Sequence, residues 1–337
     1  MARSVDNKAG DVRHWPSAED SLHVLDLPQL WQKPSADEMM EVLRDLRQAP
    51  DGFQDSGEVA AQEGSIQEAG IPAYLTSIIA SKLVWIDDED ARESIWELAS
   101  LRLSERSGRT AMPAMTRTFD IAEGLAIQLH EPSLVGDNLG LKTWASSLLL
   151  SKQLQRLSKY LPDTTSVLEL GAGTGLVGVS AACLWHTSVV LTDLPEIVPN
   201  LEHNLGLNRE TISSWRGNAT AMPLDWSDLS SAPTKDEEKY MIVIAADPIY
   251  SPDHPPMLVD TIARWLKETG DARVVIELPR RFHYTGERAH LEDLMRQAKF
   301  EIVVQGVESG YDDWKDESGH QAVVECEYSI WRRNDKC

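Results

Sequence analysis

The sequence predicts a mixed α/β protein with a mostly parallel seven-stranded sheet, helices on both faces and a mainly helical region ahead of it. From residue 166 onward, apolar strand patterns alternate with helical patterns in the 337-residue chain, an order typical of parallel sheets with crossover helices. The last two strand patterns are separated only by the loop GYDDWKDESGH. Because that loop is too short for a crossover helix, strand seven is expected to run antiparallel to the other six.

The N-terminal region, residues 1–117, is expected to be mainly helical. Ser35 is a suitable N-cap, the acidic run DDED suits the first turn of a helix, and apolar residues follow at helical spacing. Helices are therefore expected over residues 35–48, 73–85 and 88–106. Residues 51–70 are rich in glycine, glutamate and small side chains, which predicts a solvated loop or linker.

The second predicted domain spans residues 118–337. It opens with FDIAEGLAIQLHE, which reads as two short strands joined at Glu123 and Gly124, and an amphipathic helix is expected next, over residues 141–157. The seven strands of the sheet are expected in SVLELGA, SVVLTD, TISSWRGN, YMIVIAAD, ARVVIELP, FEIVVQGV and QAVVECEYSIWRR. Crossover helices are expected over residues 176–185, 197–207, 256–266 and 287–298.

The net charge narrows the possible partners. The chain carries 54 acidic and 32 basic side chains, which gives a formal charge of -22. A nucleic-acid backbone requires lysine and arginine to displace its counterions. Nucleic acid is therefore not an expected partner, whereas a basic protein is.

Metal sites and membrane spans are not indicated. The three cysteines lack CxxC spacing and the nine histidines include no HExxH motif, so we expect neither a disulfide framework nor a metal site. We interpret His254, His283 and His290 as surface or loop residues. No segment approaches about eighteen uncharged apolar residues and no signal-peptide pattern is present, so we expect no membrane span and a cytoplasmic location, with the nucleus as the alternative.

A glycine-rich turn follows the first strand of the sheet in VLELGAGTGLVG. The strand ends at Gly171 and a helix begins near Gly175, so backbone N–H groups and a helix N-terminus can face a ligand there. Gly173, Gly175 and Gly178 satisfy GxGxxG, but the match begins two residues later than in a dinucleotide-binding fingerprint. The turn alone leaves open a dinucleotide, another ligand or a tight turn without a ligand.

Two further stretches indicate a nucleoside. Asp193 closes the second strand, SVVLTD, where a carboxylate can accept both hydroxyl groups of a ribose. Asp225 and Trp226, in the loop PLDWSD, can offer an acceptor and an aromatic face to an adenine ring. Core packing is the alternative for Trp226.

The fourth strand ends in Asp247, Pro248, Ile249 and Tyr250. Open α/β sheets place their sites at this edge of the sheet, where a carboxylate, a carbonyl fixed by proline and a phenol can hold an amine. The alternative for Asp247 is a helix cap.

ELGAGTG, LTD, LDW and AADPIY, together with GLKTWASSLLLSKQL, resemble family 16 of the seven-β-strand methyltransferases that use S-adenosylmethionine, most of which are protein-lysine methyltransferases. LHEPSLVGDNLGLKTWASSLLLSKQL and DPIYSPDHPPML resemble the fungal members that act on translation elongation factor 2. The resemblance covers about residues 118–333. It implies a Rossmann-like class I methyltransferase sheet, S-adenosylmethionine as cofactor, S-adenosylhomocysteine as product, and a lysine of elongation factor 2 as substrate.

The resemblance also implies roles for individual residues. It assigns cofactor binding to Trp144, Glu169, Gly171, Gly173, Asp193, Asp225, Trp226 and Ala246. The two glycines would cradle the methionine portion, Asp193 would bind the ribose, and Asp225 and Trp226 would flank the adenine. Asp247 and Tyr250 match the acid-x-x-Tyr motif and would act as the catalytic pair that captures the lysine. For Trp144, on the expected helix over residues 141–157, ordinary packing is the alternative.

Three other functions stay open on the sequence. One is a catalytically silent cofactor-binding adaptor, and another is a methyltransferase that acts on a different protein or on a small-molecule amine. The third is an NAD-dependent oxidoreductase, which rests only on the offset GxGxxG.

Overall fold

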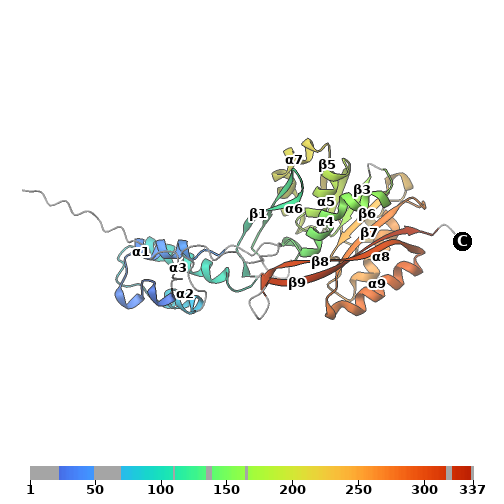
Figure 1. Ribbon diagram of the computed structural model, residues 1–337. Coiled ribbons are helices and arrows are strands. Elements are labelled where there is room, and N and C mark those ends of the chain that lie inside the picture. Colours follow the sequence, from blue (N-terminus) through green and yellow to red (C-terminus); the bar gives the residue numbers. More distant parts are fainter. Residues whose placement is uncertain are drawn as a thin grey trace, which may run out of the picture. The chain divides into compact units, whose positions relative to one another are not determined.

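The computed structural model describes residues 23–48, 70–108, 111–133, 139–163, 166–315 and 321–334. These residues form two compact units, one ending at Ser107 and the other beginning at Gly108 (Figure 1). The domain boundary expected at residue 117 stays a prediction. The loop expected over residues 51–70 lies, except for Gly70, outside the described residues. No helix in the described ranges is long and apolar enough to cross a membrane.

The first unit contains the three expected helices, α1 (Ala36–Asp45), α2 (Ile71–Ala80) and α3 (Glu89–Ser104). Ser35 caps α1 as predicted, because its Oγ accepts a hydrogen bond from the Glu38 amide at 3.3 Å and Glu38 accepts one from the Ser35 amide at 3.0 Å. Asp88 caps α3 through the Ala91 amide. Apolar side chains from all three helices form one core: Met39, Val42, Leu43, Ile71, Leu75, Ile78, Ile95 and Ala99.

The second unit contains the predicted seven-stranded sheet. Its strands are β3 (Val167–Leu170), β4 (Ser188–Asp193), β5 (Asn218–Pro223), β6 (Ile242–Ala246), β7 (Arg273–Pro279), β8 (Phe300–Lys315) and β9 (Gln321–Arg333). They lie in the order β5-β4-β3-β6-β7-β9-β8. β9 lies between β7 and β8 and runs antiparallel to both, while the other six strands share one direction. The predicted fold class is therefore confirmed, with the last strand in the chain inserted inside the sheet.

The prediction of a strand in TISSWRGN is wrong. Arg209–Ser214 form helix α7, whose Ile212 side chain is buried in the apolar cluster around α5. The third strand in chain order, β5, begins at Asn218 and runs through NATAMP, pairing with β4 along its whole length. Local β-propensity favoured a strand around Ile212, but burial of this side chain in helical geometry decided the structure.

Helices cover both faces of the sheet (Figure 1). Helices α4 (Ala145–Leu157), α5 (Leu176–Leu184) and α6 (Val198–Leu207) contribute to one apolar cluster, and α8 (His254–Trp265) and α9 (Thr285–Gln297) to the other. Alternation along β7 shows the division, because Val275 belongs to the first cluster and its neighbours Val274 and Ile276 to the second. Both faces are thus buried, as expected for parallel strands.

A separate hairpin, β1 (Met115–Ala122) and β2 (Leu125–Glu131), packs on the α4 and α5 side. Asn204 on α6 and Asn208, which follows the end of that helix, form hydrogen bonds with the outer edge of β2. Asn204 accepts from the His130 amide at 2.7 Å and donates to the His130 carbonyl at 3.1 Å. Asn208 makes the corresponding pair with Gln128, at 3.0 and 2.6 Å. This asparagine ladder replaces the hydrogen bonds that a further strand would give.

Candidate active site

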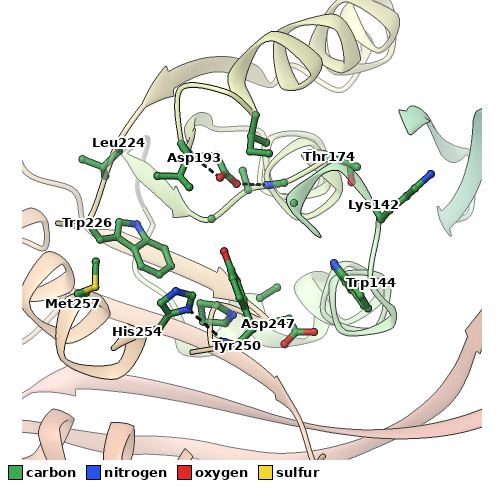
Figure 2. A pocket seen from close by; sticks show the side chains of 18 of the residues that line it. Lys142, Trp144, Thr174, Asp193, Leu224, Trp226, Asp247, Tyr250, His254 and Met257 are labelled. Atoms are coloured by element: carbon green, nitrogen blue, oxygen red, sulfur yellow. Dashed lines mark hydrogen bonds between the residues drawn. The ribbon is translucent and has the colours of Figure 1, made fainter. Parts of the chain in front are cut away.

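A cavity of about 540 Å³ lies at the carboxyl edge of the parallel strands, entirely within the second unit (Figure 2). This is the size of a typical small-molecule site. The sequence-predicted residues that line it are Trp144, Gly171, Gly173, Asp193, Asp225, Trp226, Ala246, Asp247 and Tyr250. The chain therefore brings together, from distant segments, nearly every residue that was expected to form a site.

The turn after β3 has a backbone conformation and close contacts that favour glycine. Gly171, Gly173 and Gly175 have φ of 69°, 57° and 91°, in the left-handed region that favours glycine. A Cβ on Gly173 would lie 2.9 Å from the Gly140 carbonyl oxygen, and one on Gly171 would lie 3.4 Å from the Trp226 ring. A side chain at either position would thus clash with, or crowd, the walls of the cavity.

Backbone hydrogen bonds hold the Asp193 carboxylate beside the glycine turn. Its Oδ2 accepts a hydrogen bond from the Gly173 amide at 2.7 Å, and its Oδ1 accepts one from the Leu194 amide at 2.8 Å. Burial raises the pKa of the Asp193 carboxyl, and these two amides oppose the rise. The carboxylate therefore lies at the end of β4, held at a fixed distance from the turn.

Aromatic rings border the cavity on two sides. Figure 2 shows Trp226 and His254 on one side and Trp144 on the other. The Tyr250 and His254 rings meet edge to face at 4.3 Å between centroids, and the Trp226 ring lies 6.1 Å from His254. His254, interpreted from the sequence as a surface or loop residue, is instead the first residue of α8 and lines the cavity. Burial lowers the pKa of its imidazole, which favours the neutral ring.

Tyr250 presents a neutral phenol to the site. Burial, together with the negative charges of Asp193, Asp247 and Glu196, raises the pKa of this phenol above its usual value. The side chain keeps an exposed fraction of 49%. It can therefore donate or accept a hydrogen bond at the mouth of the cavity without ionising.

Asp247 follows β6 in a left-handed conformation, with φ of 52°, which aspartate tolerates better than most side chains. Its amide donates to the Glu277 carbonyl at 2.8 Å. Its Oδ2 accepts a hydrogen bond from Ser146 Oγ at 3.5 Å and lies 3.4 Å from Arg281 Nη2. Helix α8 begins at His254, so the alternative of Asp247 as a helix cap is wrong and its carboxylate lines the cavity.

Trp144 immediately precedes α4, which begins at Ala145 and not at residue 141 as expected. Its backbone is extended, and its ring lines the cavity. The guanidinium carbon of Arg281 lies 5.2 Å from the centroid of this ring, within the range of a cation–π contact.

Glu169 is the one predicted cofactor-binding residue that does not line the cavity. It is 2% exposed on β3, beneath the turn, and its Oε2 would lie 2.3 Å from a Cβ on Gly178. Burial raises the pKa of Glu169 well above its usual range, and Asp193 adds to that rise. Its assignment to the cofactor stays a prediction.

Sequence reasoning missed several other lining residues, among them Lys142, Thr174, Met257, Arg281 and Tyr284. Arg281 and Tyr284 follow β7, and the rule that sites lie beyond the carboxyl ends of strands was the signal that could have found them. Lys142 precedes α4 and carried no such signal.

The lining fits S-adenosylmethionine. The turn at Gly171 and Gly173 leaves room for a ligand close to the backbone, and the Asp193 carboxylate lies where ribose hydroxyls could donate to it. The Trp226 ring offers an apolar face for adenine. These residues and Ala246 would hold the cofactor.

Comparison with known proteins gives related sequences. A protein family model described as lysine methyltransferase matches residues 123–297. Protein-lysine N-methyltransferase EFM2 of Saccharomyces cerevisiae is 37% identical over 265 residues, which cover 72% of this chain and 61% of the yeast protein. Protein-lysine N-methyltransferase rrg1 of Schizosaccharomyces pombe is 33% identical over 314 residues, covering 92% of this chain and 98% of that protein.

Solved structures are more distant. The crystal structure of M. jannaschii TYW2 in complex with AdoMet superposes with a TM-score of 0.39 at 15% identity, covering 65% of this chain and 87% of that one. The assignment of the chain to a family therefore rests on the family model and the sequence relatives. They agree with the resemblance given by the sequence motifs, and the chain belongs to the lysine methyltransferase family, whose enzymes depend on S-adenosylmethionine.

Proposed function

We propose that this chain transfers a methyl group from S-adenosylmethionine to a lysine side chain of translation elongation factor 2, in the cytoplasm. The observation that carries the proposal is that Asp247, Tyr250 and Trp144 line the same cavity as the glycine turn and Asp193. The residues proposed to hold the amine and those proposed to hold the nucleoside therefore line one cavity. The names of the two fungal relatives support a protein-lysine substrate. Elongation factor 2 is proposed from the resemblance in residues 129–154 and 247–258.

The bound cofactor would supply an electrophilic methyl group on a sulfonium, so the protein is required mainly to position the amine. The Asp247 carboxylate can accept hydrogen bonds from the lysine nitrogen, and the neutral phenol of Tyr250 can orient it from the other side. The Trp144 face can hold the cationic form as it enters. The proton leaves the amine for water before methyl transfer, and neither Asp247 nor Tyr250 is assigned as a general base.

Labelled S-adenosylmethionine tests the proposal directly. The full chain would be incubated with purified elongation factor 2, and peptides would be read by mass spectrometry, with Asp247→Asn as the matched control. A labelled lysine in the wild-type reaction, formed at least about tenfold more slowly with the control, supports the proposal.

The alternatives give different results in the same assay. Label on another protein of a cytosolic extract, with none on elongation factor 2, would reject the substrate but keep the reaction. Calorimetric binding of S-adenosylmethionine without any labelled product would indicate the silent adaptor. Binding of NAD in place of S-adenosylmethionine would indicate the oxidoreductase.

A further inference from the structure

Arg281 bridges two groups that the proposed reaction uses. It follows β7, and its side chain, 32% exposed, lines the cavity. Its Nη2 lies 3.4 Å from Asp247 Oδ2, and its guanidinium carbon lies 5.2 Å from the centroid of the Trp144 ring. The Asp247 side chain is only 9% exposed, so water screens this ion pair poorly. A fixed positive charge thus lies beside the carboxylate that would receive the substrate amine.

The charge balance at this point matters for the reaction. A free lysine amine has a pKa of about 10.4, and only its neutral form can accept a methyl group. A lone carboxylate within about 4–6 Å raises the pKa of an amine, whereas a cation at that distance lowers it. Asp247 alone would therefore bind the lysine while keeping it in the unreactive ammonium form.

We propose that Arg281 is a positioning residue that offsets the negative charge of Asp247 and so favours the neutral, reactive form of the substrate lysine. This inference rests on the proposed function, because it assigns the carboxylate of Asp247 to the lysine. The guanidinium also fixes the position of Asp247 Oδ2, from which it lies 3.4 Å away.

Other ionisable groups face this ion pair or the same cavity from neighbouring elements. They are Lys142 before α4, Asp193 at the end of β4, Asp225 after β5, Tyr250 after β6, His254 on α8, Glu277 on β7, Tyr284 after β7 and Cys326 on β9. All of these side chains are still present when Arg281 is replaced. A difference in pH profile between wild type and an Arg281 variant therefore reports the guanidinium charge.

Arg280 is a matched control in the same turn. Its Nη1 lies 3.1 Å from Glu325 Oε2, the two side chains are 45% and 53% exposed, and Arg280 does not line the cavity. Arg280→Met removes the same charge one residue away but leaves Asp247 and Trp144 with their neighbours.

The experiment measures kcat and KM for methylation of the protein substrate between pH 7 and 9.5, with wild type, Arg281→Met, Arg281→Lys and Arg280→Met. For Arg281→Met we expect kcat at pH 7 to fall about tenfold or more, as one pKa unit in the bound amine would give. The loss should shrink as the pH rises, and KM should stay the same or fall. Arg281→Lys should restore the wild-type profile, and Arg280→Met should keep it. Calorimetry should show unchanged affinity for S-adenosylmethionine in all four proteins.

The inference would be overturned if Arg281→Met lost the same fraction of kcat at every pH, or if Arg281→Lys lost as much kcat as Arg281→Met. Either result would leave the proposed function intact. Absence of lysine methylation by the wild-type enzyme would overturn the proposed function and this inference together.

Discussion

At the scale of a single residue, Asp193 contributes both to the lining of the cavity and to the conformation of the glycine turn. It lines the cavity at the end of β4, and it accepts the Gly173 amide at 2.7 Å and the Leu194 amide at 2.8 Å. A carboxylate that already holds the turn by hydrogen bonds is available to ribose hydroxyls in a fixed place. We therefore expect cofactor affinity and the local geometry of the turn to depend on the same side chain.

We expect Asp193→Ala to weaken S-adenosylmethionine binding by at least about tenfold, because hydrogen bonds to a charged group contribute about 1.5–3 kcal/mol. Isothermal calorimetry measures this affinity. Thermal unfolding of the same variant should show a decrease in Tm, since the Gly173 amide loses its acceptor. An unchanged affinity would remove Asp193 from the cofactor site.

Asp247→Asn separates catalysis from cofactor binding. Asparagine tolerates the left-handed backbone found at this position, with φ of 52°, whereas alanine would add strain. We expect methylation to fall by about tenfold or more, because the neutral amide loses a charge-assisted hydrogen bond to the lysine. The dissociation constant for S-adenosylmethionine should stay within about twofold. Methylation at the wild-type rate would disprove the assignment of Asp247.

The sequence predicted those site residues that follow a strand directly. Asp193 and Asp247 come at the ends of apolar runs, and the glycines after β3 mark a turn, so their place in the sheet follows from chain order. Arg281 also follows a strand, so the same rule could have placed it at the site, but its contacts could not be predicted. Its role depends on the turn after β7 bringing its guanidinium to Trp144 and Asp247, and this contact between distant segments leaves no periodic pattern.

At the scale of secondary-structure elements, the asparagine ladder joins α6 to β2. Asn204 is fully buried, and its side-chain amide also donates to the Thr174 carbonyl in the glycine turn at 3.0 Å. One side chain therefore links the hairpin, the helix and the turn beside the cavity.

Asn204→Leu should be strongly destabilising. It removes the partners of His130 and Thr174 backbone groups inside the protein, and each buried group left unpaired costs about 1–3 kcal/mol. Urea unfolding would measure the change, with Glu202→Ala, at an exposed position of the same helix, as control. A loss below about 0.5 kcal/mol, as for an ordinary surface substitution, would show that the ladder contributes little.

The sheet was predictable because its buried strands are nearly continuous apolar runs: β6 has no polar residue, and Glu169 in β3 and Glu277 in β7 are single interruptions. β5 was missed because NATAMP contains small and polar residues, has no fully buried side chain and, within the described part of the chain, pairs only with β4. Such an edge strand lacks the hydrophobic signal on which strand prediction depends.

Glu277 on β7 gives a prediction about pH. The side chain is fully buried, neither carboxyl oxygen has a hydrogen-bond partner among the described residues, and burial raises its pKa well above the usual range. In the folded protein, Glu277 therefore keeps its proton at pH values at which the unfolded chain, with an ordinary pKa of about 4.3, has released it. The contribution of this difference to the free energy of unfolding is complete at low pH and is lost as the pH rises through the pKa of the folded state.

Glu277→Gln cannot ionise and should remove this pH dependence. We expect the Tm of the variant, measured relative to that of the wild type, to be a few degrees higher at pH 8.5 than at pH 5. This change corresponds to about 1 kcal/mol in the free energy of unfolding. Thermal unfolding followed by circular dichroism at both pH values is the measurement. Parallel curves for the two proteins would show that Glu277 does not ionise differently on unfolding.

At the scale of the whole molecule, the second unit forms the cavity and the first unit has its own apolar core. Because α1 contributes Met39 and Leu43 to that core, a deletion ending at residue 70 would expose it. Residues 1–107 must therefore be removed together. The formal charge of -22 on the whole chain should attract a basic partner surface, most strongly at low ionic strength.

Deletion of residues 1–107 tests whether this region docks the protein substrate. We expect unchanged affinity for S-adenosylmethionine, a raised KM for the protein and a flatter dependence of kcat/KM on salt, measured between about 20 and 300 mM salt, where the screening length shortens severalfold. Unaltered kinetics would exclude a docking role. Loss of cofactor binding or of solubility would indicate instead a helical cap on the sheet domain.

The position of β9 has a consequence for how the chain acquires its structure during synthesis. β9 lies between β7 and β8, so the sheet cannot be completed until residues 321–333 have been synthesised, although five parallel strands and their helices are made earlier. Until then β7 presents an open edge of unpaired amides and carbonyls, and β8 has no neighbour to pair with. Such an edge readily recruits strands from other chains. Nascent protein that stops short of residue 321 is therefore exposed to aggregation, and the non-local pairing of β7 with β9 makes closure of the sheet a late step of folding.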